Sequence, residues 1–246
     1  MRCQPQYKGP VYIWLKNKQS CLLCGESADE ATPICMACET DLPWLGDHCD
    51  TCALPLPAAG LTCGQCLQEP PGFERVIAPW TYSFPVDSLI TRFKHGAKWP
   101  FGRLLAELLV QSVHHRFEEG LERPDALVPV PLAVKRLRQR GFNQAAMLAR
   151  WLSAGLEIPC DEQLLRRVQD TSAQQELKAD ARKKNLRNAF ALMPDASVKG
   201  RHLALVDDVL TTGATAQALA RLLMAAGAAR VDVYCLARTP KPGDTA

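Results

Sequence analysis

The run from residue 203 to residue 217, LALVDDVLTTGATAQ, constrains the fold more than any other stretch of the chain. Its first four residues are all apolar, as expected for a parallel strand that is covered on both faces. The carboxylates Asp207 and Asp208 follow, and the small residues 211–215 then lead into an alanine-rich stretch. The run therefore predicts a buried strand, a short loop and a helix, which together form the repeating unit of an α/β sheet.

This strand, loop and helix have the chemistry of a phosphate site. Ligands of open parallel sheets bind at the carboxyl ends of the strands, and the free N–H groups of a helix N-terminus attract anions. Because the two acids would repel a phosphate, we expect them to face ribose hydroxyls or a Mg²⁺ shared with phosphates. The absence of a following Gly-Lys-Ser/Thr excludes a Walker-type loop. Mere packing and a simple metal site are the plainer alternatives.

The whole string resembles the phosphoribosyl pyrophosphate (PRPP) motif of type I phosphoribosyltransferases, in which two acids, two apolar residues and Thr-Thr-Gly-x-Thr follow an apolar run. The resemblance implies that Asp207 and Asp208 act at the ribose in catalysis, with Mg²⁺ accompanying PRPP. Some proteins with this motif only sense the ligand. The predicted PRPP-binding residues are Val209, Leu210, Thr211, Thr212, Gly213, Ala214 and Thr215.

Eight of the 11 cysteines form four Cys-x-x-Cys pairs near the N-terminus. The unit from Cys21 to Cys38 recurs, displaced by 28 residues, from Cys49 to Cys66. Each pair supplies two thiolates, and two pairs complete a tetrahedral Cys₄ zinc site. The sequence therefore predicts two structural zinc ions in a double zinc ribbon. The eight predicted ligands are Cys21, Cys24, Cys35, Cys38, Cys49, Cys52, Cys63 and Cys66.

Disulfides and redox chemistry explain these pairs less well. The N-terminal residues lack the apolar core of a secretory signal, and a redox Cys-x-x-Cys usually occurs once, beside a βαβ unit. Sequential ribbons are favoured by the repeat, although a cross-braced pairing stays open. His48, next to Cys49, could replace a thiolate, but a surface role is favoured because the cysteines already suffice.

Charge divides the chain in the same way as the cysteines. Residues 1–72 hold four Lys and Arg against eight Asp and Glu, whereas the rest of the 246 residues is basic. We therefore predict a zinc-ribbon module at 1–72, which ends at Pro70-Pro71-Gly72, where the cysteines stop and turn residues cluster. The resemblance to type I phosphoribosyltransferases implies a phosphoribosyltransferase-like domain at 73–246, with a hood over about 73–125 and a core over about 126–240. No apolar run is long enough to span a bilayer, so we expect a soluble protein without membrane insertion.

Short apolar runs alternate with helical periodicity in the second domain, which indicates an α/β fold. The expected fold is a type I phosphoribosyltransferase-like parallel sheet with flanking helices. The predicted strands are 75–82, 126–130, 203–208 and 231–237, and the predicted helices are 101–117, 142–154 and 214–226.

A basic segment follows the predicted strand 126–130. We interpret it as a strand-end loop that binds pyrophosphate, because arginines form charge-assisted, often bidentate hydrogen bonds with such anions. A solvated basic surface is the alternative. The candidate ligands are Lys135, Arg136, Arg138 and Arg140, and Asn143 could cap the next helix or point into the site.

Residues 169–188 are polar and weakly periodic, so they could form an exposed helix or a linker. In a phosphoribosyltransferase-like fold this is the place of a mobile loop that closes over the substrate and excludes water. That resemblance predicts that Arg182, Lys183 and Lys184 reach the departing pyrophosphate.

Taken together, the chain resembles the ComF/GntX family of phosphoribosyltransferase-like proteins. The resemblance rests on the cysteine ribbons, on the segments 93–96 (FKHG), 140–144 (RGFNQ) and 181–186 (ARKKNL), and on the PRPP motif. It implies cytoplasmic work in natural competence or in the use of external DNA, with PRPP or a related ribose 5-phosphate as ligand. Single-stranded DNA and a competence helicase-like protein are implied as partners. A phosphoribosyltransferase, a non-catalytic DNA-handling adaptor and a PRPP-sensing regulator are the candidate functions.

Overall fold

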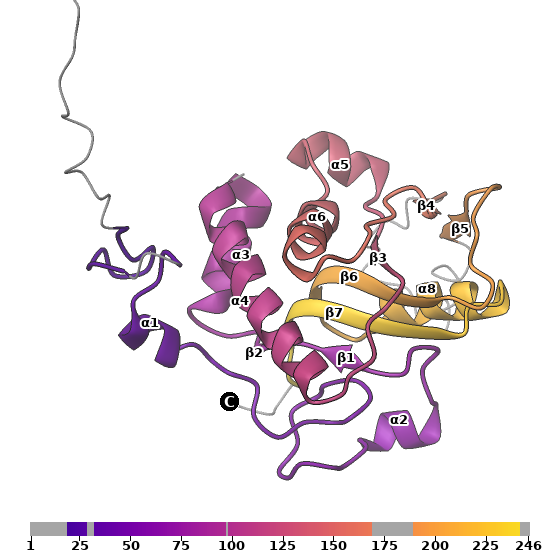
Figure 1. Ribbon diagram of the computed structural model, residues 1–246, viewed down its shortest axis with the longest axis horizontal. Helices are drawn as coiled ribbons and strands as arrows, with labels where there is room; N and C mark the ends of the chain where they lie inside the picture. The colour runs from indigo at the N-terminus through magenta and orange to yellow at the C-terminus, as the bar shows by residue number, and fades with distance from the viewer. Residues whose placement is uncertain (1–18, 29–31, 97, 169–188, 242–246) are drawn as a thin grey trace, which may run out of the picture. The chain divides into compact units, whose positions relative to one another are not determined.

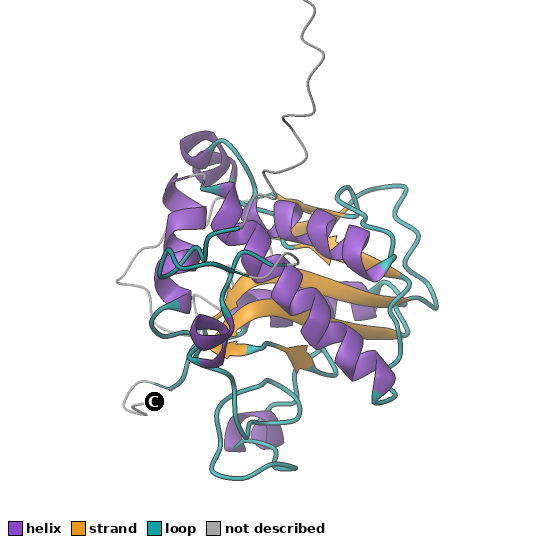
Figure 2. Cartoon of the chain, turned by 60° about the vertical axis from the view of Figure 1, so that its left-hand side comes forward, coloured by secondary structure: helices purple, strands orange, loops and turns teal. Residues whose placement is uncertain are grey.

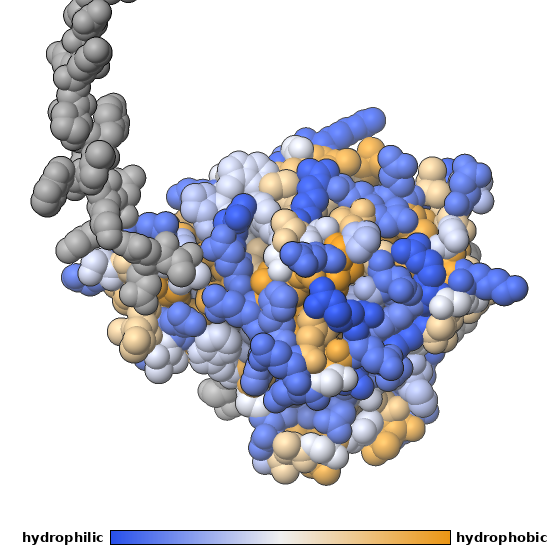
Figure 3. All heavy atoms as spheres, in the orientation of Figure 1, coloured by the Kyte–Doolittle hydropathy of each residue, from blue (hydrophilic) through white to orange (hydrophobic). Residues whose placement is uncertain are grey.

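The computed structural model describes residues 19–28, 32–96, 98–168 and 189–241 (Figure 1). The predicted lid at 169–188, with Arg182, Lys183 and Lys184, lies outside the described residues. The chain divides into two compact units, residues 1–41 and 42–246. Hydrophilic side chains cover much of the face shown in Figure 3. Within the described ranges, no helix has both the length and the apolar character needed to cross a membrane.

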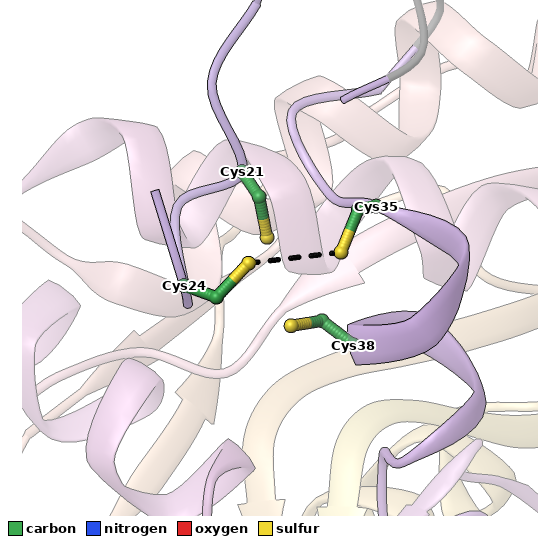
Figure 4. A group of neighbouring side chains, drawn as sticks. All are labelled: Cys21, Cys24, Cys35 and Cys38. Carbon is green, nitrogen blue, oxygen red and sulfur yellow. Dashed lines mark hydrogen bonds between the residues drawn. The ribbon is translucent and has the colours of Figure 1, made fainter. Parts of the chain in front are cut away.

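The first unit contains a cysteine knuckle and a short helix, α1 (Met36–Thr40). The chain turns tightly after Cys21, because the N–H of Gly25 donates to the carbonyl of Cys21 at 2.9 Å. Gly25 has φ +83°, which glycine adopts at little cost. This turn brings Cys24 back toward Cys21, so that both thiols lie on the same side of the chain (Figure 4).

A parallel sheet forms the centre of the second unit (Figure 1). Its strand order is β1-β7-β6-β3, and β2 pairs with β7 beyond the end of β1. The sheet confirms the predicted parallel α/β fold. The strands are β1 (Val76–Ile77), β2 (Trp80–Thr81), β3 (Ala126–Pro129), β6 (His202–Leu210) and β7 (Arg230–Arg238).

Helices cover both faces of this sheet, as Figures 1 and 2 show. On one face α4 (Trp99–Glu118) and α6 (Gln144–Leu156) pack against each other, and α3 (Val86–Gly96) packs on α4. The other face carries α8 (Ala214–Ala225) and a small antiparallel pair, β4 (Leu165–Arg167) with β5 (Phe190–Leu192). Burial on both faces explains why β6 begins as an unbroken apolar run.

Two strand predictions need correction. The predicted strand 75–82 is two short strands, because Pro79 has no N–H to donate and interrupts the ladder. The predicted strand 203–208 ends on the acids, whereas β6 runs from His202 to Leu210 and continues for two residues beyond them. Pairing with β7 also continues past the acids, since Val209 lies opposite Ala237 and Leu210 lies opposite Arg238 in the register.

The predicted basic loop after β3 is also wrong in its local structure, because the residues form a helix, α5 (Val134–Arg140). Lys, Arg, Leu and Gln all favour a helix, and no residue in this stretch breaks one. The helix ends where Gly141 adopts φ +77° and its N–H donates to Leu137 O at 2.8 Å. Asn143 then caps α6, accepting a hydrogen bond from Ala145 N at 3.1 Å.

The second cysteine repeat, which includes α2 (Gly64–Gln68), is joined to the edge of the sheet. Leu45 N donates to Pro79 O at 2.7 Å, and the rings of Trp44 and Trp80 lie 5.6 Å apart. These contacts place the second repeat in the same compact unit as the sheet. The module boundary near residue 72 stays a prediction.

Close packing between α3 and α4 gives the first testable expectation. A methyl group added to Gly102 would lie 2.5 Å from a ring carbon of the fully buried Phe93. We expect Gly102→Ala to lower the free energy of unfolding by about 2 kcal/mol through overpacking. Gln111→Ala, at an exposed position of α4, is the control and should change it little. Denaturant titration measures both, and equal stabilities would contradict this packing.

Candidate functional site

The acid pair lies near the carboxyl end of β6, where the strand leads into the loop before α8. Asp208 N donates to Asp207 Oδ1 at 2.9 Å, so the first carboxylate is held against the backbone of the second acid. The neighbouring strand β3 ends at the same edge, with Val130 N donating to Val206 O at 2.9 Å. The predicted PRPP segment and the predicted pyrophosphate segment therefore leave the sheet side by side.

The loop after β6 leads directly into the first turn of α8. Gly213 is the N-cap of this helix and adopts φ +74°, although a Cβ there would meet no atom within 4 Å. Glycine is thus required by the backbone conformation and not by a lack of space. Thr211 and Thr212 are exposed, and the first N–H groups of α8 have no partner within the helix. This end of α8 is suited to bind an anion.

Lys94 connects the acid pair to α3. Its Nζ lies 3.0 Å from Asp208 Oδ1, and the two side chains are only 18% and 15% exposed. In the sequence, Lys94 stands out only as part of the segment 93–96, on which the family resemblance rests in part. Because α3 and β6 lie far apart in the sequence, no local pattern could reveal the ion pair.

A basic cavity of about 600 Å³ opens beside this ion pair. Two of the four predicted pyrophosphate ligands, Arg136 and Arg140, line it together with Lys94 and His95. The other two, Lys135 and Arg138, are exposed on α5 outside the cavity lining. The cavity thus gathers positive charge from two helices next to the acid pair. Its residues are Lys94, His95, Gly96, Arg136, Gln139 and Arg140.

Burial changes the ionisation of Asp207. Burial of the Asp207 carboxyl, together with the charge of Asp208, raises the pKa of Asp207 to about 7. Burial also raises the pKa of the Cys235 thiol on the paired strand to about 12, so this thiol is inert. A ligand that donates hydrogen bonds, such as a sugar diol, would compensate the buried Asp207 carboxylate.

Arg238 is a residue of the site that the sequence analysis missed. It is the last residue of β7 and lies opposite Leu210 in the register. Its guanidinium donates to Leu210 O at 3.0 Å and also to Thr211 O, at the start of residues 211–215, the predicted phosphate loop. The only local signal is its place at the end of an apolar strand, where a charged residue ordinarily marks the strand end.

The first four cysteines converge on one point, as Figure 4 shows. Their sulfur atoms all lie within 4.8 Å of one another, and Cys24 Sγ is 3.7 Å from Cys35 Sγ. Four thiolates around a tetrahedral zinc, with Zn–S bonds of about 2.3 Å, have sulfurs about 3.8 Å apart. The donor set and the spacing therefore fit zinc.

The second cluster repeats this arrangement with Cys49, Cys52, Cys63 and Cys66. Cys52 Sγ lies 3.6 Å from Cys63 Sγ, and Cys63 N donates to Cys49 Sγ at 3.3 Å. Each cluster is thus formed by two Cys-x-x-Cys pairs that follow each other in the sequence, which is the sequential arrangement and not the cross-braced one. His48 lies outside the cluster, with its Nδ1 2.6 Å from Gly46 O.

Sequence comparison agrees with this architecture. Residues 18–67 match the double zinc ribbon domain, and residues 140–244 match the phosphoribosyl transferase domain. The fold and the two cysteine clusters thus define a protein with a zinc ribbon domain and a phosphoribosyltransferase-type α/β domain.

The DNA utilization protein YhgH of Escherichia coli is 40% identical to the chain over 207 residues, which cover 84% of the chain and 90% of that protein. Competence protein F of Haemophilus influenzae is 35% identical over 207 residues, which cover 83% of the chain and 90% of that protein. The chain belongs to this family of DNA utilization and competence proteins. A purine phosphoribosyltransferase from Pyrococcus horikoshii superposes with a TM-score of 0.38 at 16% identity, covering 57% of the chain and 78% of that structure.

Metal content tests the two clusters. We expect two zinc ions per chain by elemental analysis of the purified protein, because each cluster offers a closed set of four thiolates. Cys38→Ser and Cys66→Ser should each lower the content toward one. A wild-type content below two would contradict the double ribbon.

The raised pKa of Asp207 predicts a pH-dependent stability. Its ordinary value of 3.8 applies in the unfolded chain and about 7 in the folded one, so the folded state binds more protons between these values. The contribution of Asp207 to the free energy of unfolding therefore becomes less favourable as the pH rises from about 4 through 7. Asp207→Asn removes this penalty and should raise the melting temperature at pH 8 by about 3 °C, the shift that roughly 1 kcal/mol produces in a domain of this size.

The gain from Asp207→Asn should shrink toward pH 5. Asp195→Asn, at an exposed position after β5, is the matched control and should change the melting temperature little at any of these pH values. Thermal denaturation without ligand at several pH values measures both variants. A gain for Asp207→Asn that does not depend on pH would rule out the raised pKa.

Proposed function

We propose that the chain binds PRPP at the end of β6 and transfers its phosphoribosyl group to a nucleobase, with release of pyrophosphate. One observation carries the proposal: the acid pair, the Gly213 loop and the basic cavity share one edge of the sheet, and the Lys94–Asp208 ion pair joins them. A ligand with a diol, a phosphate and a pyrophosphate matches these three features in that order.

Each part of PRPP has a candidate partner on this edge. The 5-phosphate would accept hydrogen bonds from the N–H groups of residues 211–215 and from the threonine hydroxyls. The ribose hydroxyls would donate to Asp207 and Asp208. The pyrophosphate would lie toward Arg136 and Arg140, whose guanidinium groups suit bidentate contact with phosphate oxygens. Lys135 and Arg138 remain candidates at the exposed surface of α5, and Arg182, Lys183 and Lys184 remain candidates for a closing lid.

The reaction would be a substitution at the anomeric carbon of the ribose. A ring nitrogen of the acceptor forms the new bond as the bond from this carbon to the pyrophosphate oxygen breaks, and the departing group keeps the electron pair. The acceptor loses its ring N–H proton to solvent, so that the product nucleotide carries a neutral base. Mg²⁺ bound with PRPP would neutralise part of the charge on the leaving group. The protein contributes chiefly by holding the reacting groups in place and by stabilising the developing charge.

The biological setting of this reaction would be the use of external DNA in the cytoplasm. The names of the related proteins, which refer to DNA utilization and competence, support this part of the proposal. Bases released from DNA would be suitable acceptors, since their ring nitrogens are nucleophilic. A competence helicase-like protein that delivers single strands would be a fitting partner.

One observation favours a second candidate, a non-catalytic adaptor for single-stranded DNA. Trp99 is 41% exposed, and its ring lies 4.6 Å from that of Phe142, just after the basic helix α5. Aromatic rings beside a basic surface can stack bases while the cations hold the phosphates. In this case the PRPP pocket would serve regulation, as it would in a PRPP sensor.

A binding and turnover experiment tests the proposal. Wild-type protein should bind PRPP with Mg²⁺ by calorimetry, and it should release pyrophosphate with at least one member of a panel of nucleobases. The double variant Asp207→Asn, Asp208→Asn should bind PRPP at least about tenfold more weakly, because it loses two charge-assisted hydrogen-bond acceptors. The matched control for the change of charge is the double variant Glu118→Gln, Glu119→Gln. It alters two adjacent, exposed acids at the C-terminal end of α4.

The outcomes separate the candidates. Unchanged PRPP affinity in the double variant would refute the site. PRPP binding without turnover, together with salt-sensitive binding of single-stranded DNA, would replace the transferase with the adaptor. PRPP binding with neither turnover nor binding of single-stranded DNA would favour the PRPP-sensing regulator.

A further inference from the structure

The side chain of Arg238 ties the phosphate loop to the second cysteine cluster. It is 6% exposed, and all four of its hydrogen-bond acceptors are backbone carbonyls. Three of them lie at the phosphate loop and strand end: Leu210 O at 3.0 Å, Thr211 O, and Thr239 O at 2.7 Å. The fourth is Cys52 O, which accepts from Nε at 2.9 Å. One planar group therefore fixes two segments that are distant in the sequence.

Cys52 belongs to the metal knuckle of the second cluster. After it the chain turns sharply, with Ala53 at φ +54° and its N–H donating to Cys49 O at 2.9 Å. Alanine disfavours this conformation, so the turn needs support from its surroundings. A metal bound by the thiolates of Cys49 and Cys52 would supply that support. It would thereby fix the direction of the Cys52 carbonyl.

We propose that Arg238 is a positioning residue that couples metal binding at the second cluster to the shape of the phosphate loop. The proposal rests on the proposed function, because the loop is taken as the PRPP site. A metal-loaded knuckle holds Cys52 O, which orients the guanidinium, and the guanidinium holds the carbonyls of Leu210 and Thr211. The N–H groups that follow are then preorganised for the phosphate. None of the four acceptors lies in the first cluster, so the coupling is specific to the second.

Coupling of this kind is reciprocal. If metal at the second cluster strengthens phosphate binding, phosphate binding must strengthen metal retention there by the same factor. The two ribbons, although similar in sequence, would then differ in role. The first would stabilise only its own unit, whereas the second would also set the affinity of the ligand site.

Hydrogen exchange measured by mass spectrometry on the full chain, without ligand, tests the coupling directly. Cys66→Ser disables the second cluster and leaves Cys52 and Arg238 unchanged, and Cys38→Ser is its counterpart 28 residues earlier. We expect peptides covering 208–215 to exchange at least about tenfold faster in Cys66→Ser than in wild type. Cys38→Ser should leave them unchanged. Equal exchange in the two variants would overturn the proposal.

Arg238→Lys gives a second test that keeps both clusters intact. Lysine retains the charge but lacks the planar fork, so it cannot hold carbonyls on both sides at once. With two zinc ions per chain and a melting temperature near that of wild type, this variant should bind PRPP about tenfold more weakly. Unchanged affinity would overturn the proposal. If wild-type protein does not bind PRPP, the proposed function fails, but the ligand-free exchange experiment still decides the coupling.

Discussion

The parallel pairing of β6 with β7 holds the sheet together and positions the candidate site. It buries the centre of the sheet, and its register places Asp207 opposite Cys235 and Leu210 opposite Arg238. The first pairing puts a carboxylate in a desolvated position. The second brings an arginine to the start of the phosphate loop. Both features of the site thus follow from one ladder of backbone hydrogen bonds.

Charge at this edge of the sheet is arranged for a ligand more than for stability. Two adjacent carboxylates repel each other, and burial of the first disfavours its ionised form. Lys94 compensates the second carboxylate, while Arg136 and Arg140 of α5 line a cavity whose described lining residues include no carboxylate. Selection for stability alone would remove such a cluster of charges. Binding sites, by contrast, often keep groups that lower the stability of the fold.

The sequence predicted those features that repeat or lie close together along the chain. The apolar run before Asp207, the small residues before α8 and the displaced cysteine pairs are local patterns, and each predicted its structure. The contacts of Lys94 with Asp208 and of Arg238 with Cys52 join segments more than a hundred residues apart, so no periodicity reveals them. The charge of the segment 135–140 predicts an anion-binding loop, but its high helix propensity determines the local structure. The break at Pro79 and the extension of β6 past its acids depend on partner strands and not on local preference.

A crystal structure of the protein with PRPP and Mg²⁺ would show where each part of the ligand binds. We expect the 5-phosphate within hydrogen-bond distance of the backbone N–H groups of residues 211–215. The ribose hydroxyls should contact Asp207 and Asp208, and the pyrophosphate should point toward Arg136 and Arg140. A phosphate bound elsewhere, or an acid pair that makes no contact with the ribose, would contradict the proposed PRPP site.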